Sequence, residues 1–170
     1  MLRVDLGRLD REGALPVEGQ IPSDDPMWHD CGIEWDGPVD VRLRASFAGS
    51  GEVVVRGMVR GGLRQECRRC LRPVAGKFGE EVTMVFSADT TAADSDEGHV
   101  FVFDPVRRDL DIRDAVRQEV ILAMNPYVVC DPECRGLCPR CGANLNEGAC
   151  GCTAEEVDLR WQALRALRDR

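Results

Sequence analysis

Apolar and polar residues alternate along much of this chain, and a period of two is typical of β-strands with one buried face. The clearest example is residues 39–48, where apolar side chains at every odd position from Val39 to Phe47 lie on one face. The pattern predicts strands or strand-like segments over 1–9, 39–48, 52–60, 63–67, 74–87 and 99–103. Proline and glycine interrupt residues 10–36, which are predicted to be irregular, and the acidic residues 88–98 are predicted to form a solvated loop.

Helical periodicity follows the predicted strands at two places. Residues 112–124 carry apolar side chains at helical spacing, with Asp111 as the predicted N-cap and Pro126 just beyond the end. A terminal helix is predicted over 154–168, behind a capping-box pattern. Together the elements predict an α+β fold: a mainly antiparallel sheet or partly closed barrel, covered by the long helix.

Cysteine adds most to this picture, because eight of the nine cysteines fall into pairs with the spacing of metal ligands. The eight are Cys67, Cys70, Cys130, Cys134, Cys138, Cys141, Cys150 and Cys152. Six of them lie within 130–152, a short stretch that is rich in turn residues. The turn at 138–142 has the form of a zinc knuckle, in which Gly142 lets the backbone bend so that its amides face the sulfurs.

Two other uses of clustered cysteines are a disulfide framework and a redox pair. Disulfide frameworks belong to small secreted domains, and the sequence shows no apolar run of the kind found in a signal peptide near residue 1. A redox Cys-x-x-Cys lies between a strand and a helix, whereas the pair at 138–141 lies among Gly, Pro and Asn. A metal site is therefore favoured, and the knuckle form favours zinc over an iron–sulfur cluster.

We expect one or two zinc ions in four-cysteine sites, although the sequence does not fix which thiols share an ion. The two-site hypothesis groups the cysteines as follows. Cys67, Cys70, Cys130 and Cys134 form the first group, and Cys138, Cys141, Cys150 and Cys152 form the second. The first site would join segments that are distant in sequence and would thereby stabilise the fold. Residues 1–129 are predicted to form a β-rich body with its covering helix. Residues 130–170 are predicted to form a zinc-binding segment with a C-terminal helix, packed as one unit with the body. Cys31 stands alone and is predicted to be a small buried hydrophobic residue.

Charge is distributed unevenly along the chain. The formal net charge of −8 argues against indiscriminate nucleic-acid binding, yet residues 56–77 hold seven Lys or Arg and one acid, which gives 7 − 1 = +6. The candidate RNA-binding residues are Arg60, Arg64, Arg68, Arg69 and Arg72. The plainer interpretation of this stretch is a solvated strand face. Only 5% of residues are aromatic, so recognition of phosphates and shape is favoured over stacking on bases.

Two further features bear on the location of the protein. No apolar run approaches membrane-spanning length, which predicts a soluble protein with no membrane partner. The many free thiols predict a reducing compartment, the cytoplasm.

Three motifs, taken in their order, resemble a known family. They are Glu-Cys-Arg-Arg-Cys-Leu-Arg-Pro at 66–73, an acidic helix ending Val-Ile-Leu-Ala-Met-Asn-Pro at 111–126, and the cysteine pattern of 134–152. This set is similar to the YceD-like family, bacterial and plastid proteins described as large ribosomal RNA subunit accumulation proteins. The resemblance implies a role in 23S ribosomal RNA accumulation or processing and in large-subunit assembly, without enzymatic activity. It also implies that Cys67, Cys70 and the six later cysteines are metal ligands.

The sequence leaves three functions open. The first is a non-catalytic, zinc-stabilised assembly factor that contacts large-subunit ribosomal RNA, a pre-ribosomal particle or a protein partner. The second is a zinc-stabilised protein-interaction module without direct RNA binding, which the net charge favours. The third is an enzyme, either a thiol oxidoreductase or a zinc hydrolase. Four-thiolate sites leave no open metal position for water, and no His-rich or paired-carboxylate group is visible, so no small-molecule substrate is expected.

Overall fold

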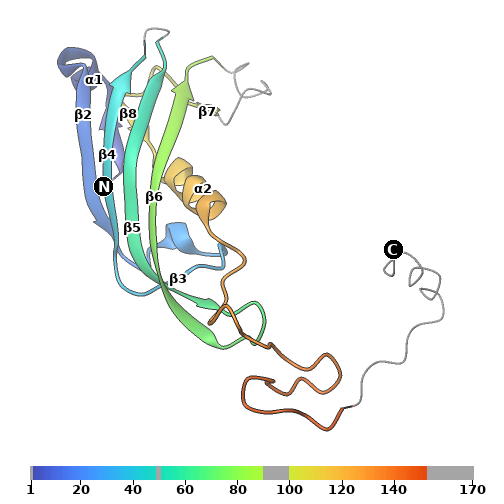
Figure 1. Ribbon diagram of the computed structural model, residues 1–170. Coiled ribbons are helices and arrows are strands. Elements are labelled where there is room, and N and C mark those ends of the chain that lie inside the picture. Colours follow the sequence, from blue (N-terminus) through green and yellow to red (C-terminus); the bar gives the residue numbers. More distant parts are fainter. Residues whose placement is uncertain (1, 49–50, 90–99, 153–170) are drawn as a thin grey trace, which may run out of the picture.

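The structure is a computed structural model that describes residues 2–48, 51–89 and 100–152 (Figure 1). Its elements are β1 (Arg3–Asp5), α1 (Leu6–Glu12), β2 (Ala14–Ile21), the 3-10 turn η1 (Pro26–Trp28), β3 (Glu34–Trp35), β4 (Val39–Phe47), β5 (Val53–Glu66), β6 (Pro73–Ser87), β7 (Val100–Val102), β8 (Asp109–Asp111) and α2 (Arg113–Ala123). This mixture confirms the predicted α+β class. The predicted terminal helix over 154–168 and most of the acidic loop lie outside the described residues.

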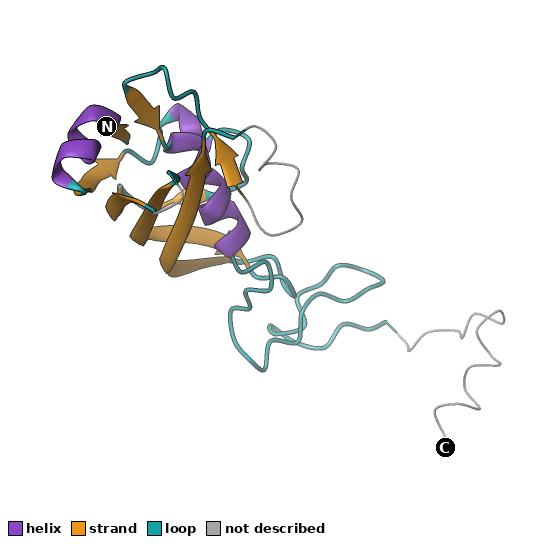
Figure 2. Ribbon diagram, turned by 90° about the horizontal axis from the view of Figure 1, so that it is seen from above, coloured by secondary structure: helices purple, strands orange, loops and turns teal. Residues whose placement is uncertain are grey.

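The strands form one large sheet and one small one. The large sheet has the order β2-β4-β5-β6-β7, with β3 added to the end of β5, and only the β6–β7 pair is parallel. The small sheet pairs β1 with β8. Within the described residues no pairing joins β2 to β7, so the sheet is open and curved, and the alternative of a partly closed barrel was wrong (Figures 1 and 2).

The core lies on one face of the large sheet, as the alternation predicts. Val39, Val41 and Ala45 of β4 have no exposed surface, whereas Phe47 at the end of this strand is 38% exposed. Inward side chains of β5 and β6 complete the apolar face, and Ala115, Val116 and Val120 of α2 pack into the same cluster. Trp28 and Trp35 are both buried in this core, with ring centroids 5.1 Å apart.

The helix α2 differs in detail from the prediction. It has 11 residues and packs mainly against β6 and η1, so it is shorter than a helix that covers the whole sheet. Its N-cap position is Ile112, without a side-chain cap. Asp111 lies at the end of β8 instead, where it pairs with Arg3 and accepts a hydrogen bond from the Arg113 amide. The strand pairing therefore displaces the capping residue by one position.

Three other boundaries were wrong. The strand predicted over 1–9 covers only Arg3–Asp5 and is followed by α1, and the region predicted to be irregular contains β2, which forms the edge of the sheet. The segments 52–60 and 63–67 form one strand, β5. In the described part of the chain, no helix is both long enough and apolar enough to cross a membrane.

The β5–β6 hairpin positions the site. The two strands have 14 and 15 residues and pair along their whole length, from Val53 with Phe86 to Glu66 with Pro73. Their far end extends past the rest of the sheet, where the segment that follows α2 runs beside it (Figure 1). The turn at this end carries the first two predicted metal ligands.

Candidate metal centres

The turn between β5 and β6 is the first cysteine knuckle. The Cys67 amide donates to the Arg72 carbonyl oxygen at 2.9 Å, and the Leu71 amide donates to the Cys67 carbonyl oxygen at 2.8 Å. These two bonds close a tight turn that buries the side chains of Cys67 and Cys70. Because the turn continues a paired hairpin, both thiols are held in place by the sheet.

The segment after α2 brings two more thiols to this turn. The Arg68 amide donates to the Val128 carbonyl oxygen at 2.9 Å, and the Leu137 amide donates to the Arg69 carbonyl oxygen at 3.0 Å. Between these two anchors lie Cys130 and Cys134. Segments about 60 residues apart in sequence thus lie side by side at the end of the hairpin.

The four sulfurs of this first centre fit one tetrahedral metal ion. All four lie within 4.8 Å of one another, with Cys67 Sγ 3.8 Å from Cys134 Sγ and Cys70 Sγ 3.6 Å from Cys130 Sγ. A tetrahedron with metal–sulfur bonds of about 2.3 Å has edges of about 3.8 Å. A cluster of several irons would hold its cysteines further apart. The donor set and spacing therefore suit a single thiophilic ion.

The second centre repeats the first knuckle. Cys138, Cys141, Cys150 and Cys152 also lie within 4.8 Å of one another. The Cys138 amide donates to the Ala143 carbonyl oxygen at 2.8 Å, and the Gly142 amide donates to the Cys138 carbonyl oxygen at 2.9 Å. Gly142 has a φ of 72°, and its counterpart in the first knuckle is Leu71, with a φ of 60°. The first knuckle thus holds this geometry with a non-glycine residue, at a cost of about 1 kcal/mol.

These two groups of four are the groups that the sequence analysis proposed. The burial of the two centres differs, because Cys67, Cys70 and Cys134 are buried whereas Cys141 and Cys152 are exposed. Cys31 belongs to neither group. Its side chain is half-buried rather than fully buried, and its thiol donates to the Trp28 carbonyl oxygen at 2.7 Å.

Electrostatics explains why four thiols at this spacing require a cation. Burial opposes ionisation of Cys67, but backbone amides of Cys130, Cys70 and Arg69 outweigh it and lower the pKa of this thiol to about 6. Burial, together with hydrogen bonds from the neighbouring thiols, raises the pKa of Cys130 to about 12. Burial also opposes ionisation of Cys134, but hydrogen bonds from the Gly136 amide and Asn146 outweigh it and lower the pKa of this thiol. Ionisation of Cys130 stays unfavourable beside these thiolates, and a bound cation would remove this penalty.

The second centre follows the same pattern. Backbone amides of Cys141 and Arg140 lower the pKa of Cys138 to about 6. Hydrogen bonds from Cys141, Cys138 and Cys150 raise the pKa of Cys152 to about 12. In each centre the first knuckle cysteine is stabilised as a thiolate, so the turn itself prepares the site for a cation.

Asn146 links the two centres, and the sequence analysis missed it. This residue lies in the loop between Cys141 and Cys150, yet its Nδ2 donates to Cys134 Sγ of the first centre at 3.4 Å. Its Oδ1 accepts from the Arg135 amide at 2.7 Å, which fixes the amide orientation. A ligand loop of the second centre thus supports a ligand of the first. No local sequence signal predicts this contact, because it depends on how the two knuckles pack.

We expect Asn146→Ala to weaken metal binding at the first centre by about 10- to 100-fold, because residues that hydrogen-bond metal ligands tune affinity to this extent. Asn146→Asp is the sharper variant, since it keeps the shape but loses the N–H donor and adds a negative charge beside a thiolate. Asn146→Asp should therefore lower the metal affinity of the first centre more than Asn146→Ala does. Cobalt substitution, followed by absorption during competition with a chelator, measures both. Equal cobalt affinity in all three proteins would contradict the role of Asn146.

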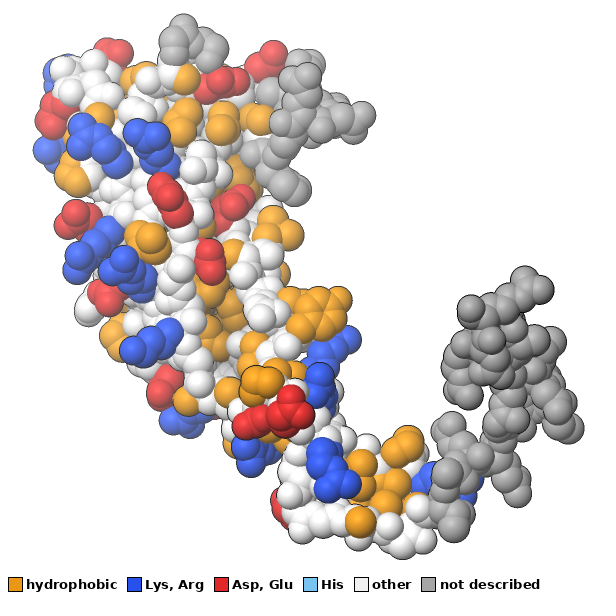
Figure 3. Space-filling view, in the orientation of Figure 1, with side chains coloured by type: hydrophobic (Ala, Val, Ile, Leu, Met, Phe, Trp, Pro, Cys, Tyr) orange, Lys and Arg blue, Asp and Glu red, His pale blue; other side chains and the backbone are white. Residues whose placement is uncertain are grey.

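The five arginines proposed to bind RNA have different surroundings. Arg64 pairs with Asp36 at 3.1 Å and with Glu34 at 3.9 Å. Arg68 lies over the Tyr127 ring and donates to the Pro126 carbonyl oxygen. Only Arg60 of the five has no partner among the described residues. Figure 3 shows basic side chains spread over this region and over the sheet, with acidic ones between them.

Arg69 and Arg72 contact the first metal centre itself. The Arg69 guanidinium donates to the carbonyl oxygens of Pro132 and Cys134, at 3.0 and 2.9 Å. Arg72 lies near Cys130, and the ionised form of this thiol would raise the pKa of Arg72, chiefly by Coulomb attraction. Arg69 therefore holds the ligand segment in place, and Arg72 adds a positive charge beside Cys130. The charge count could not distinguish these roles from RNA binding.

The protein is thus an α+β protein with an open sheet. Two four-cysteine sites, each able to hold a metal ion, extend one end of this sheet. A family model matches residues 55–168, about two thirds of the chain, and its description is large ribosomal RNA subunit accumulation protein YceD. The chain belongs to the YceD family, as the three motifs indicated.

The relatives agree with this assignment. An uncharacterized protein of Mycobacterium tuberculosis (strain H37Rv) is 33% identical over 126 residues, which are 74% of this chain and 60% of that protein. A chloroplastic large ribosomal RNA subunit accumulation protein, YCED homolog 1 of Arabidopsis thaliana, is 38% identical over 68 residues, 40% of this chain and 21% of that protein. Its namesake in Zea mays is 24% identical over 135 residues, 63% of this chain and 46% of that protein. The chain thus spans about 60% of the mycobacterial relative's length, and no solved structure matches it.

Proposed function

We propose that this protein supports accumulation of large-subunit ribosomal RNA as a non-catalytic factor whose RNA- or partner-binding end is held together by two zinc ions. The family description and the names of the plant relatives support the ribosomal role. The observation that carries the structural part is the pair of four-thiol groups, each with all sulfurs within 4.8 Å. When bound, zinc would neutralise the thiolates and fix the turns. Reduced thiols are needed for this, so the proposal places the protein in the cytoplasm.

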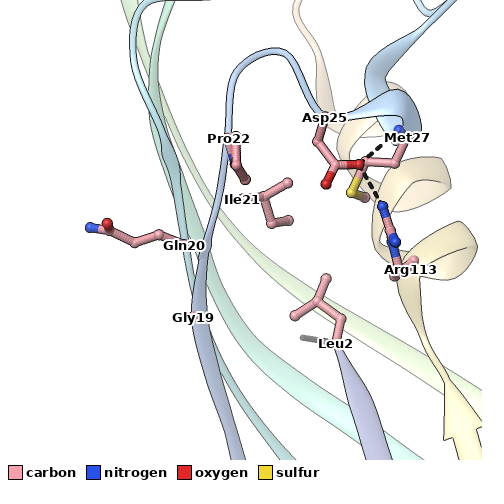
Figure 4. A pocket seen from close by; sticks show the side chains of 8 residues that line it. All are labelled: Leu2, Gly19, Gln20, Ile21, Pro22, Asp25, Met27 and Arg113. Atoms are coloured by element: carbon pink, nitrogen blue, oxygen red, sulfur yellow. Dashed lines mark hydrogen bonds and ion pairs between the residues drawn. The ribbon is translucent and has the colours of Figure 1, made fainter.

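The charged residues that line one hollow of the body are consistent with a non-catalytic role, because they pair with each other. This hollow, of about 260 Å³, lies between β2, η1 and the start of α2, away from both cysteine centres (Figure 4). Its charged lining residues are Asp25 and Arg113, and they pair with each other. Asp25 also accepts a hydrogen bond from the Met27 amide at 2.9 Å. Both side chains are therefore engaged in holding η1 against α2 rather than poised for acid–base chemistry.

The proposed function predicts a specific defect in cells. Depletion of the protein should lower mature 23S relative to 16S ribosomal RNA, and plasmid-borne wild type should restore the ratio. Cys67→Ser should fail to restore it at equal protein level, because the first centre cannot close. Quantitative sequencing of total RNA measures the ratio. An unchanged ratio after depletion would refute the proposal.

A protein-interaction module remains the second candidate, and one observation favours it. Leu71 and Tyr127, both beside the first knuckle, are 56% and 68% exposed, which is unusual for apolar side chains on a rigid turn. Capture of tagged protein from lysate, with and without RNase, separates the two candidates. Ribosomal RNA that is retained without RNase favours the first, and assembly proteins that are retained after RNase favour the second.

A further inference from the structure

The outer face of the large sheet carries arginines that the metal centres do not account for, and two of them, Arg42 and Arg44, lie outside the basic stretch 56–77. On β4, Arg42 and Arg44 point away from the core, and on β5, Arg56 and Arg60 do the same. All four are exposed, and among the described residues none has a carboxylate within ion-pair distance. Their charges are therefore free to meet a ligand.

The register of the sheet places two of these arginines directly opposite each other. Arg44 pairs with Arg56 across β4 and β5. The same row continues to Pro16 on β2 and Thr83 on β6, so it holds no acid. Like charges that face each other across a strand pair destabilise a sheet. An anion bound between the two guanidinium groups would turn this repulsion into attraction.

The neighbouring rows define the extent of the site. The row toward the β4–β5 turn is Ala14, Ser46, Val54 and Val85, which carries no charge. On the other side, Arg42 lies diagonal to Arg56, but its row holds two acids, Glu18 opposite it on β2 and Glu81 beyond Met58 on β6. In the next row Asp40 faces Arg60 and accepts a hydrogen bond from Gln20. The positive potential is thus strongest at Arg44 and Arg56, with Arg42 beside them.

We propose that Arg44, Arg56 and Arg42 form a binding site for the phosphate backbone of RNA on the outer face of the sheet. Guanidinium groups bind phosphate oxygens in bidentate fashion. The outward positions of these rows hold no aromatic side chain, so the site reads phosphates rather than stacked bases. This inference rests on the proposed ribosomal function, but it locates the contact on the sheet rather than at the knuckle.

The test measures RNA binding by the full-length, zinc-loaded protein. The probe is a fluorescein-labelled RNA hairpin of mixed sequence with a stem of about 16 base pairs, followed by anisotropy at about 0.1 M salt. Arg44→Glu with Arg56→Glu should weaken RNA binding on the order of 10- to 100-fold, because two phosphate contacts are lost and two negative side chains repel the backbone. A milder pair, Arg44→Gln with Arg56→Gln, should lower the slope of log K against log salt by about two.

Control variants keep the test specific. Arg107→Glu with Arg108→Glu makes the same change in net charge at exposed residues between β7 and β8, and should leave binding within about twofold. The glutamine pair removes like-charge repulsion, so its unfolding midpoint should be equal to that of wild type or higher, which guards against misfolding.

The outcomes separate this inference from the proposed function. The site is supported if the Arg44 and Arg56 variants bind the RNA hairpin more weakly than wild type and the Arg107 and Arg108 control does not. Equal binding by all variants, or no binding by wild type, overturns it. The depletion experiment then decides independently whether the protein supports ribosomal RNA accumulation. The glutamate pair and the glutamine pair can also be used in the lysate capture described above. If both bind RNA normally but no longer capture an acidic protein that wild type captures, the face is a protein-binding surface and the RNA site is refuted.

Discussion

Cys67→Ser should release the cysteine-rich segment from the body while the sheet stays folded. Cys67 is completely buried in a small cluster made of Cys67, Cys70 and Cys134, which is separate from the main core. This cluster contains little apolar surface, so we expect a bound metal ion to supply the stability that holds the segment. A serine hydroxyl does not replace a thiolate ligand, and we expect a local loss of more than about 4 kcal/mol.

Hydrogen exchange measures this release directly. The amides of Arg68 and Leu137, which bond across to Val128 and Arg69, should lose protection on the order of 1,000-fold, since each 1.4 kcal/mol is a factor of ten. The amide of Val55, in the middle of β5, should keep its protection. Cys31→Ser is the matched control, because it removes the cysteine outside both groups. Full protection of Arg68 and Leu137 in Cys67→Ser would show that packing alone holds the segment.

Gly57→Ala should be the most damaging small change in the sheet itself. Gly57 has a φ of 151°, and a β-carbon there would lie 2.2 Å from the Arg42 carbonyl oxygen and 2.9 Å from Leu43 Cα. Both contacts are with backbone, so they can be relieved only if β4 and β5 move apart. We expect the free energy of unfolding to fall by about 2–4 kcal/mol, from backbone strain and steric overlap together.

The matched control for Gly57→Ala lies on the next strand. At Gly76 of β6 an added β-carbon would meet nothing closer than 3.9 Å, so Gly76→Ala should be neutral or stabilise by about 0.5–1 kcal/mol. Urea unfolding followed by circular dichroism, with zinc present, compares the two. Equal stability of the two variants would mean that β4 and β5 do not approach as closely at Gly57 as the structure has them.

Strict alternation made the central strands predictable, and interruptions hid the others. The strands over 39–48 and 74–87 were found because apolar side chains recur on one face of each. β4 buries Val39, Val41, Leu43 and Ala45, and β6 buries Phe78, Val82, Met84 and Phe86. β2 was missed because Pro16 and Gly19 were interpreted as breakers, although a proline is tolerated on an edge strand such as β2. Gly61 and Gly62, which separate the predicted segments 52–60 and 63–67, belong to β5, and the missing side chain at Gly61 makes room for the Trp35 ring.

The metal centres were more predictable than the charged surface. Ligand spacing is local, so the two knuckles could be recognised from the sequence. The grouping of the eight thiols stayed a hypothesis there, because it depends on how distant segments pack. Charge counting along the chain could not show that Arg69 braces a ligand segment or that Arg44 faces Arg56. Those facts depend on strand register and on contacts between distant segments.

The measurement that tests the account most directly is the metal content of protein purified under reducing conditions, by native mass spectrometry with elemental analysis. The account predicts two zinc ions per chain, no disulfide, and loss of one ion in Cys67→Ser. Fewer than one zinc per chain, or cysteines paired as disulfides within the two groups, would contradict the claim that metal holds this end of the protein together.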